Sequence, residues 1–143
     1  REIMQQKYIN WDEKFSVHVE IIDSQHKKLF ESINTLLQLM EKEIIIEDLE
    51  EILDDMFDYF DYHFSSEEKL IKSHPEFEHH RQRHLEFINN VKEYNNKFLA
   101  KDPEIIAEKM FVFLSEWLQN HILREDRYSF DYLQKHNLLK DEA

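Results

Sequence analysis

The sequence lacks cysteine and glycine entirely and has only two prolines among its 143 residues. Without cysteine there is no disulfide, thiolate nucleophile, zinc finger or cysteine-ligated iron–sulfur cluster. Hairpins, barrels and phosphate-binding loops depend on glycine where φ is positive or where the backbone approaches a ligand closely, so these folds are disfavoured. Long helices joined by short polar loops need no glycine, and this class remains.

Basic residues are also scarce, with 18 Lys and Arg against 31 Asp and Glu and a net charge of -13. The chain therefore lacks the basic surface of a nucleic-acid-binding protein and would be repelled by anionic lipid, so we expect no nucleic-acid partner. No apolar run approaches the roughly 18 residues of a membrane span. No signal-peptide pattern is evident either, so we expect a cytoplasmic protein without membrane insertion.

Apolar residues recur at helical spacing in four segments, which predict helices at about 24–42, 47–73, 76–99 and 103–136. Asp23 or Ser24 is the expected N-cap of the first helix. Short connections make consecutive helices antiparallel neighbours, so the sequence predicts an all-α, up-down-up-down four-helix bundle. The expected organisation is an N-terminal arm at 1–23, the bundle at 24–136 and a C-terminal tail at 137–143.

Each predicted helix carries ionisable residues on its apolar face. In chain order these are His26, then His63 and Glu67, then His80 and His84, then His121 followed by Glu125 and Asp126. A single histidine on an apolar face is usually a core residue whose nitrogens are satisfied. Glutamate, however, is almost never fully buried unless it is paired or binds a metal.

The spacing of these residues strengthens the case for a metal site. Residues four apart on a helix differ by about 40° around its axis, so His63 with Glu67 and His80 with His84 each form one ligand pair. Pro75 lies between the two pairs and marks the turn between antiparallel helices, so both pairs lie at the same end of the bundle.

His26 opens the first helix and His121 falls in the second half of the fourth, so both belong at that same end. Five histidines and at least one carboxylate exceed what a single tetrahedral zinc ion uses, which indicates a two-metal site. Imidazole and carboxylate together suit iron, zinc, copper or manganese. Glu68 is a poorer choice of ligand than Glu67, because it lies about 140° off the face of His63.

This order of residues resembles the hemerythrin family, over about residues 11–132. The pattern comprises His26, His63-x3-Glu67, His80-x3-His84 and His121-x4-Asp126. The surrounding sequences at 22–27 (IDSQHK), 63–68 (HFSSEE) and 117–122 (WLQNHI) also resemble bacterial members.

The resemblance implies a cofactor of two iron ions joined by an oxo or hydroxo bridge, and reversible binding of O2. One ion would be held by His80, His84 and His121, and the other by His26 and His63 with one open position; Glu67 and Asp126 would bridge them. The apolar wall beside bound O2 would be Phe30, Phe64, Trp117, Leu118 and Ile122. Plain core packing is the alternative interpretation of these five residues.

The last ligand depends on the family pattern. Spacing alone favours Glu125, four residues after His121, whereas the resemblance favours Asp126, five residues after it. A shorter side chain or a π-type bulge could bring Asp126 round to the same face. The remaining histidines are expected to be non-ligands: His18, His74, His79 and His136.

The favoured function is an O2 carrier, store or delivery protein rather than an enzyme. The alternatives are an O2 or redox sensor that acts on a fused or partner signalling domain, a di-iron oxidase, peroxidase or nitric oxide-handling enzyme, and an iron-storage or structural bundle. Ferritin-like enzymes need two Glu-x-x-His motifs, and this chain has one, from Glu76 to His79. A histidine-rich, carboxylate-poor set favours reversible binding over cleavage of the O–O bond.

Overall fold

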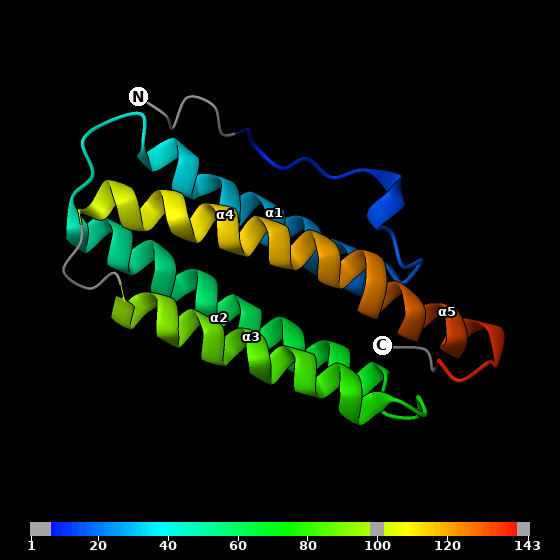
Figure 1. Ribbon diagram of the computed structural model, residues 1–143. Coiled ribbons are helices and arrows are strands. Elements are labelled where there is room, and N and C mark those ends of the chain that lie inside the picture. The colour runs from blue at the N-terminus through cyan, green and yellow to red at the C-terminus, as the bar shows by residue number, and fades with distance from the viewer. Residues whose placement is uncertain (1–6, 98–101, 140–143) are drawn as a thin grey trace.

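The computed structural model describes residues 7–97 and 102–139, and in these ranges the only regular secondary structure is helical. The elements are η2 (Glu13–Phe15), α1 (Glu20–Leu39), α2 (Ile46–Leu70), α3 (Phe77–Lys97), α4 (Pro103–His121), η3 (Ile122–Asp126) and α5 (Arg127–Lys135). Figure 1 shows α1 beside α4 and α2 beside α3, with α4 running straight into α5. The all-α, up-down-up-down four-helix bundle predicted from the sequence is confirmed.

The first helix begins earlier than predicted. α1 starts at Glu20, so the prediction that Asp23 or Ser24 caps it is wrong. The Asp23 carboxylate instead accepts hydrogen bonds from Ser16 Oγ (2.6 Å) and the Val17 backbone N–H (2.9 Å). This carboxylate therefore ties the N-terminal arm to the first turn of α1.

The connection between α2 and α3 also differs from the prediction. α2 ends at Leu70 rather than near residue 73, and α3 begins at Phe77. Pro75 lies inside the loop at residues 71–76, so it does mark the turn between the two helices. His74 belongs to this loop as well. The end predicted for the third helix, near residue 99, falls outside the described residues.

The fourth predicted helix is present as one continuous helix that contains a π turn. The Asp102 carboxylate accepts the Glu104 N–H at 3.1 Å, and Pro103 occupies the first turn of α4, where its missing N–H costs nothing. The π turn η3 joins α4 to α5 without a break.

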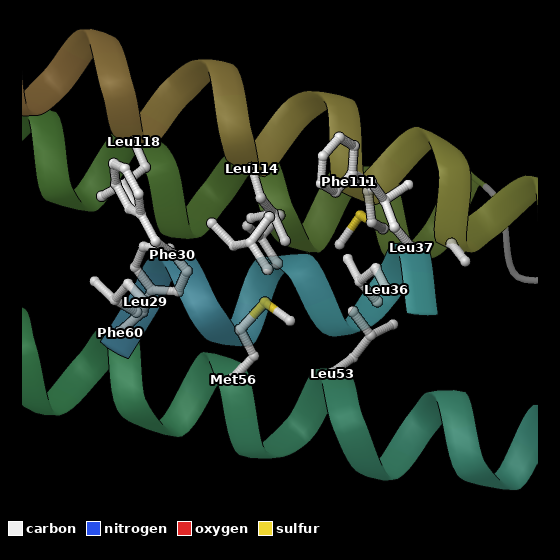
Figure 2. Close-up of a cluster of buried hydrophobic side chains, with 14 of the residues drawn as sticks. Leu29, Phe30, Leu36, Leu37, Leu53, Met56, Phe60, Phe111, Leu114 and Leu118 are labelled. Atoms are coloured by element: carbon white, nitrogen blue, oxygen red, sulfur yellow. The ribbon is translucent and has the colours of Figure 1, made fainter. Parts of the chain in front are cut away.

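Two apolar clusters lie along the bundle. The larger cluster runs between the four long helices, and Figure 2 shows part of it, including Leu36, Leu53, Met56, Phe111 and Leu114. The smaller cluster joins the arm, the start of α1, the 71–76 loop and α5 through Val17, Ile22, Ile71, Phe130 and Leu133. None of the helices in the described ranges combines the length and the apolar character of a membrane span.

We expect Leu114→Ala to destabilise the bundle by about 2–5 kcal/mol, because it removes methyl groups from a fully buried position and leaves a cavity. Urea unfolding followed by circular dichroism measures this loss. Ile105→Ala on the same helix is the matched control: Ile105 is 42% exposed, so its loss should stay near 0.5 kcal/mol. Equal losses for the two variants would contradict the placement of the core.

Candidate metal centre

Seven ionisable side chains meet at one level of the bundle. They come from α1, α2, α3, α4 and the π turn, and they are His26, His63, Glu67, His80, His84, His121 and Asp126. Their exposed fractions are all 5% or less. They form two groups whose potential ligand atoms lie within 4.8 Å of one another: Glu67, His80, His84, His121 and Asp126 in one group, and His26, His63, Glu67 and Asp126 in the other.

Glu67 belongs to both groups because its two oxygens face different histidines. Oε1 lies 3.0 Å from His80 Nε2 and 3.1 Å from His84 Nε2. Oε2 lies 3.3 Å from His63 Nε2 and 3.6 Å from His26 Nε2. One carboxylate can therefore serve a metal ion on each side.

Asp126 divides its oxygens in the same way. Oδ1 lies 2.9 Å from His80 Nε2 and 3.1 Å from His121 Nε2, whereas Oδ2 lies 3.1 Å from His26 Nε2. The π turn at Ile122–Asp126 brings this residue to the face of His121, five positions earlier. Glu125 points to the other side, where its carboxylate lies 3.7 Å from the exposed His79.

The spacing of the donor atoms fits metal ions. Two ligands bound at about 2.1 Å and at right angles to one another lie about 3 Å apart. The Nε2 atoms of His26 and His63 are 3.1 Å apart, and those of His84 and His121 are 3.0 Å apart.

The buried carboxylate oxygens also indicate a metal site. Glu67 Oε2 and both oxygens of Asp126 have no hydrogen bond, although imidazole nitrogens lie within 3.6 Å of them. Buried oxygens without hydrogen bonds are costly unless a cation satisfies them. Donors that point at a common ion rather than at each other produce this arrangement.

Three of the inward-facing imidazoles have a polar side chain within hydrogen-bond distance of Nδ1, the ring nitrogen that faces away from the centre. His63 Nδ1 lies 2.7 Å from Gln25 Oε1, His80 Nδ1 lies 2.7 Å from Ser129 Oγ, and His84 Nδ1 lies 2.7 Å from Glu68 Oε2. Such partners fix the tautomer and the orientation of a ligating ring.

Sequence reasoning missed Gln25 and Ser129, and it considered Glu68 only as a possible ligand. Gln25 and Ser129 are both buried, and a polar residue on a buried helix face next to a ligand was the available signal.

Aromatic and aliphatic side chains surround the centre. Phe64 stacks on His84, with ring centroids 4.0 Å apart, and Trp117 stacks on His121 at 4.4 Å. Phe30, Phe64, Leu118 and Ile122 are buried in the larger apolar cluster, and Trp117 packs against it half-buried. Of the five residues expected to line an O2 pocket, Phe64 and Trp117 therefore contact ligand histidines, and the other three belong to the same apolar cluster.

The four histidines predicted as non-ligands belong to neither donor group. His18, His79 and His136 are exposed. His74 is buried in the 71–76 loop, where its ring contacts Tyr132 at a centroid distance of 4.7 Å.

The two carboxylates change the proton affinities of the histidines that face them both. Burial alone would lower the pKa of His26, but its close contacts with the Asp126 and Glu67 carboxylates outweigh burial and raise this pKa from 6.5 to about 9. The same balance raises the pKa of His80 from 6.5 to about 10. Protonated imidazoles can therefore balance the buried negative charge when no metal does so.

The carboxylates are shifted in the opposite direction. Burial would raise the pKa of Glu67, but the charge of His63 and the nearby His121 imidazole hold it well below 4.5. Burial and the charge of Glu67 would raise the pKa of Asp126, but its contact with His121 keeps this pKa below 3.8. Both side chains therefore stay charged inside the bundle.

We expect the metal-free protein to be most stable near pH 6.5 and to lose stability in both directions, since burial lowers the pKa of His63 and favours its neutral form. The raised pKa values of His26 and His80 contribute stability that is complete below pH 6.5 and is lost as the pH rises through about 9 and 10. The lowered pKa values of Glu67 and Asp126 contribute stability that is lost as the pH falls below their usual 4.5 and 3.8.

Thermal unfolding of chelator-treated protein between pH 4 and 10 measures this dependence. The metal-loaded protein is the control, because bound cations replace the protons and should remove the loss on the alkaline side. A midpoint temperature that stays constant from pH 6.5 to 10 in the metal-free protein would contradict the charge balance.

Comparison with known proteins is consistent with this geometry. Residues 17–133 match the family model of the hemerythrin HHE cation binding domain. The chain is 30% identical over 126 residues to a bacteriohemerythrin of Clostridium acetobutylicum, covering 85% of this chain and 98% of that protein. It is also 30% identical over 118 residues to a myohemerythrin of Theromyzon tessulatum, covering 81% and 86%. This chain therefore belongs to the hemerythrin family.

Proposed function

We propose that this chain is a non-heme di-iron protein that binds O2 reversibly and acts as an oxygen carrier, store or delivery protein. The observation that carries the proposal is the unequal pair of donor groups. One group offers five residues and the other four, and Glu67 and Asp126 are common to both. The smaller group therefore has room for one more ligand than the larger group.

The assignment of residues follows the two groups. His80, His84 and His121 would hold one ion, His26 and His63 would hold the other, and Glu67 and Asp126 would bridge them beside an oxo or hydroxo group. The iron ions would supply the electrons that O2 takes up on binding and returns on release. Five neutral imidazoles and two carboxylates suit such ions, because the side chains add little excess negative charge.

The side chains beside the centre support binding without further reaction. Phe30, Phe64, Leu118 and Ile122 are at most 3% exposed, and the Phe64 ring lies between the two groups, 5.9 Å from the His63 ring and 4.0 Å from the His84 ring. Their side chains carry no proton to donate, and cleavage of an O–O bond requires protons. A dry, apolar wall therefore favours release of O2 unchanged.

Metal content and the visible spectrum of the purified protein test the proposal. We expect two iron ions per chain and an absorption band that appears when the reduced protein meets air and disappears under vacuum. Rapid, irreversible oxidation in air would contradict reversible binding, and the absence of iron would contradict the di-iron assignment.

We expect His121→Ala to reduce the iron content below two ions per chain and to lower the thermal stability of the loaded protein. The substitution removes one nitrogen from the larger group and leaves Asp126 Oδ1 without its neighbour at 3.1 Å. Metal analysis and thermal unfolding measure both effects.

His136→Ala is the matched control, because His136 is exposed and lies just beyond the C-terminal end of α5. It should keep two ions. Full iron content in the His121 variant would remove this histidine from the ligand set.

A further inference from the structure

The three polar side chains behind the histidines differ in charge. Each acceptor lies 2.7 Å from the Nδ1 atom of its histidine, but Gln25 and Ser129 are neutral and Glu68 is a carboxylate. Carboxylate and amide oxygens accept hydrogen bonds, so His63 and His84 carry their protons on Nδ1 and turn Nε2 toward the centre. Glu68 is therefore the only charged group among these three partners.

This charge lies on one side of the centre only. Glu67 and Asp126 each direct one oxygen to each donor group, so their charges are shared between the groups. Glu68 contacts His84, which belongs to the larger group alone. In the smaller group, His63 faces neutral Gln25, and His26 Nδ1 is buried with no hydrogen-bond partner among the described residues.

The His84 ring is held on three sides. Glu67 Oε1 lies 3.1 Å from its Nε2, Glu68 Oε2 lies 2.7 Å from its Nδ1, and the Phe64 ring stacks on its face at an interplanar angle of 10°. The neighbouring residues Glu67 and Glu68 therefore contact opposite edges of one imidazole. The exposed fraction of the Glu68 side chain is 26%, so its charge can be removed without creating a cavity in the core.

We propose that Glu68 is a positioning residue that fixes the tautomer of His84 and makes the three-histidine site the more electron-rich of the two metal sites. An ion there is bound more tightly and is harder to reduce than an ion in the two-histidine site. A carboxylate behind an imidazole makes the ring a stronger ligand, and a nearby negative charge favours the metal state of higher charge. The inference rests on the di-iron function proposed above.

Two substitutions of Glu68 separate its charge from its hydrogen bond. Glu68→Gln keeps an acceptor for His84 and removes the charge, whereas Glu68→Ala removes both. Glu78→Gln is the control, because Glu78 lies on α3 with His84, is 74% exposed and also loses one negative charge.

Iron affinity and a mediated spectroelectrochemical titration are measured for each variant. In Glu68→Gln we expect one of the two ions to bind roughly tenfold more weakly. The midpoint potential of one of the two one-electron steps should rise in the same variant. Glu68→Ala should show larger changes in both quantities, and Glu78→Gln should match the unmodified protein. Unchanged affinity and potentials in Glu68→Gln would overturn the role of the charge, even if Glu68→Ala differed.

Nitrogen-15 NMR of the His84 ring in the metal-free protein keeps this test independent of iron. We expect the His84 Nδ1–H to remain hydrogen-bonded in Glu68→Gln and to lose its acceptor in Glu68→Ala. Unchanged His84 signals in Glu68→Ala would overturn the positioning role whether or not the protein binds iron. Absence of iron from the unmodified protein would instead defeat the proposed function and leave this NMR result to decide how the ring is held.

Discussion

The structure depends on the burial of two carboxylates, Glu67 and Asp126, which are both fully excluded from solvent. A buried charge is costly unless cations or hydrogen bonds compensate it closely. Five imidazoles from four helices surround them, and protonated rings such as His26 and His80, or bound metal ions, can provide that compensation. The relative heights of the helices are therefore fixed by the need to bring these histidines to the same level.

Local structure follows from this requirement. The loop at residues 71–76 is short, so Glu67 near the end of α2 lies beside His80 near the start of α3. His121 and Asp126 are five positions apart, a spacing that a regular helix would turn about 140° apart. The π turn brings the two side chains to the same face of the helix, which explains why an irregular hydrogen-bonding pattern occurs at this place. The helix nevertheless continues from α4 into α5 without a break.

The seven ionisable side chains of the centre form a polar layer across the bundle. The four helices and the level of this layer could be predicted from the sequence, because both follow from helical periodicity and from the order of the helices along the chain. The start of α1 could not, because Asp23 bonds to the arm rather than to its own helix, and this is a tertiary contact. Asp126 could be preferred over Glu125 only through the family pattern, since the π turn has no local signal. Gln25 and Ser129 look like ordinary polar residues until their neighbours are known.

The polar layer is closed by apolar side chains at both ends. Along α1, His26 stands between Ile22 of the smaller cluster and Leu29 of the larger one. Asp126 stands in the same way between Ile122 and Phe130. This enclosure on both sides fits the reversible binding proposed above, because water and protons promote oxidation. The same enclosure deprives the carboxylates of solvent, so the proposed metal ions would supply the compensating positive charge between the two clusters.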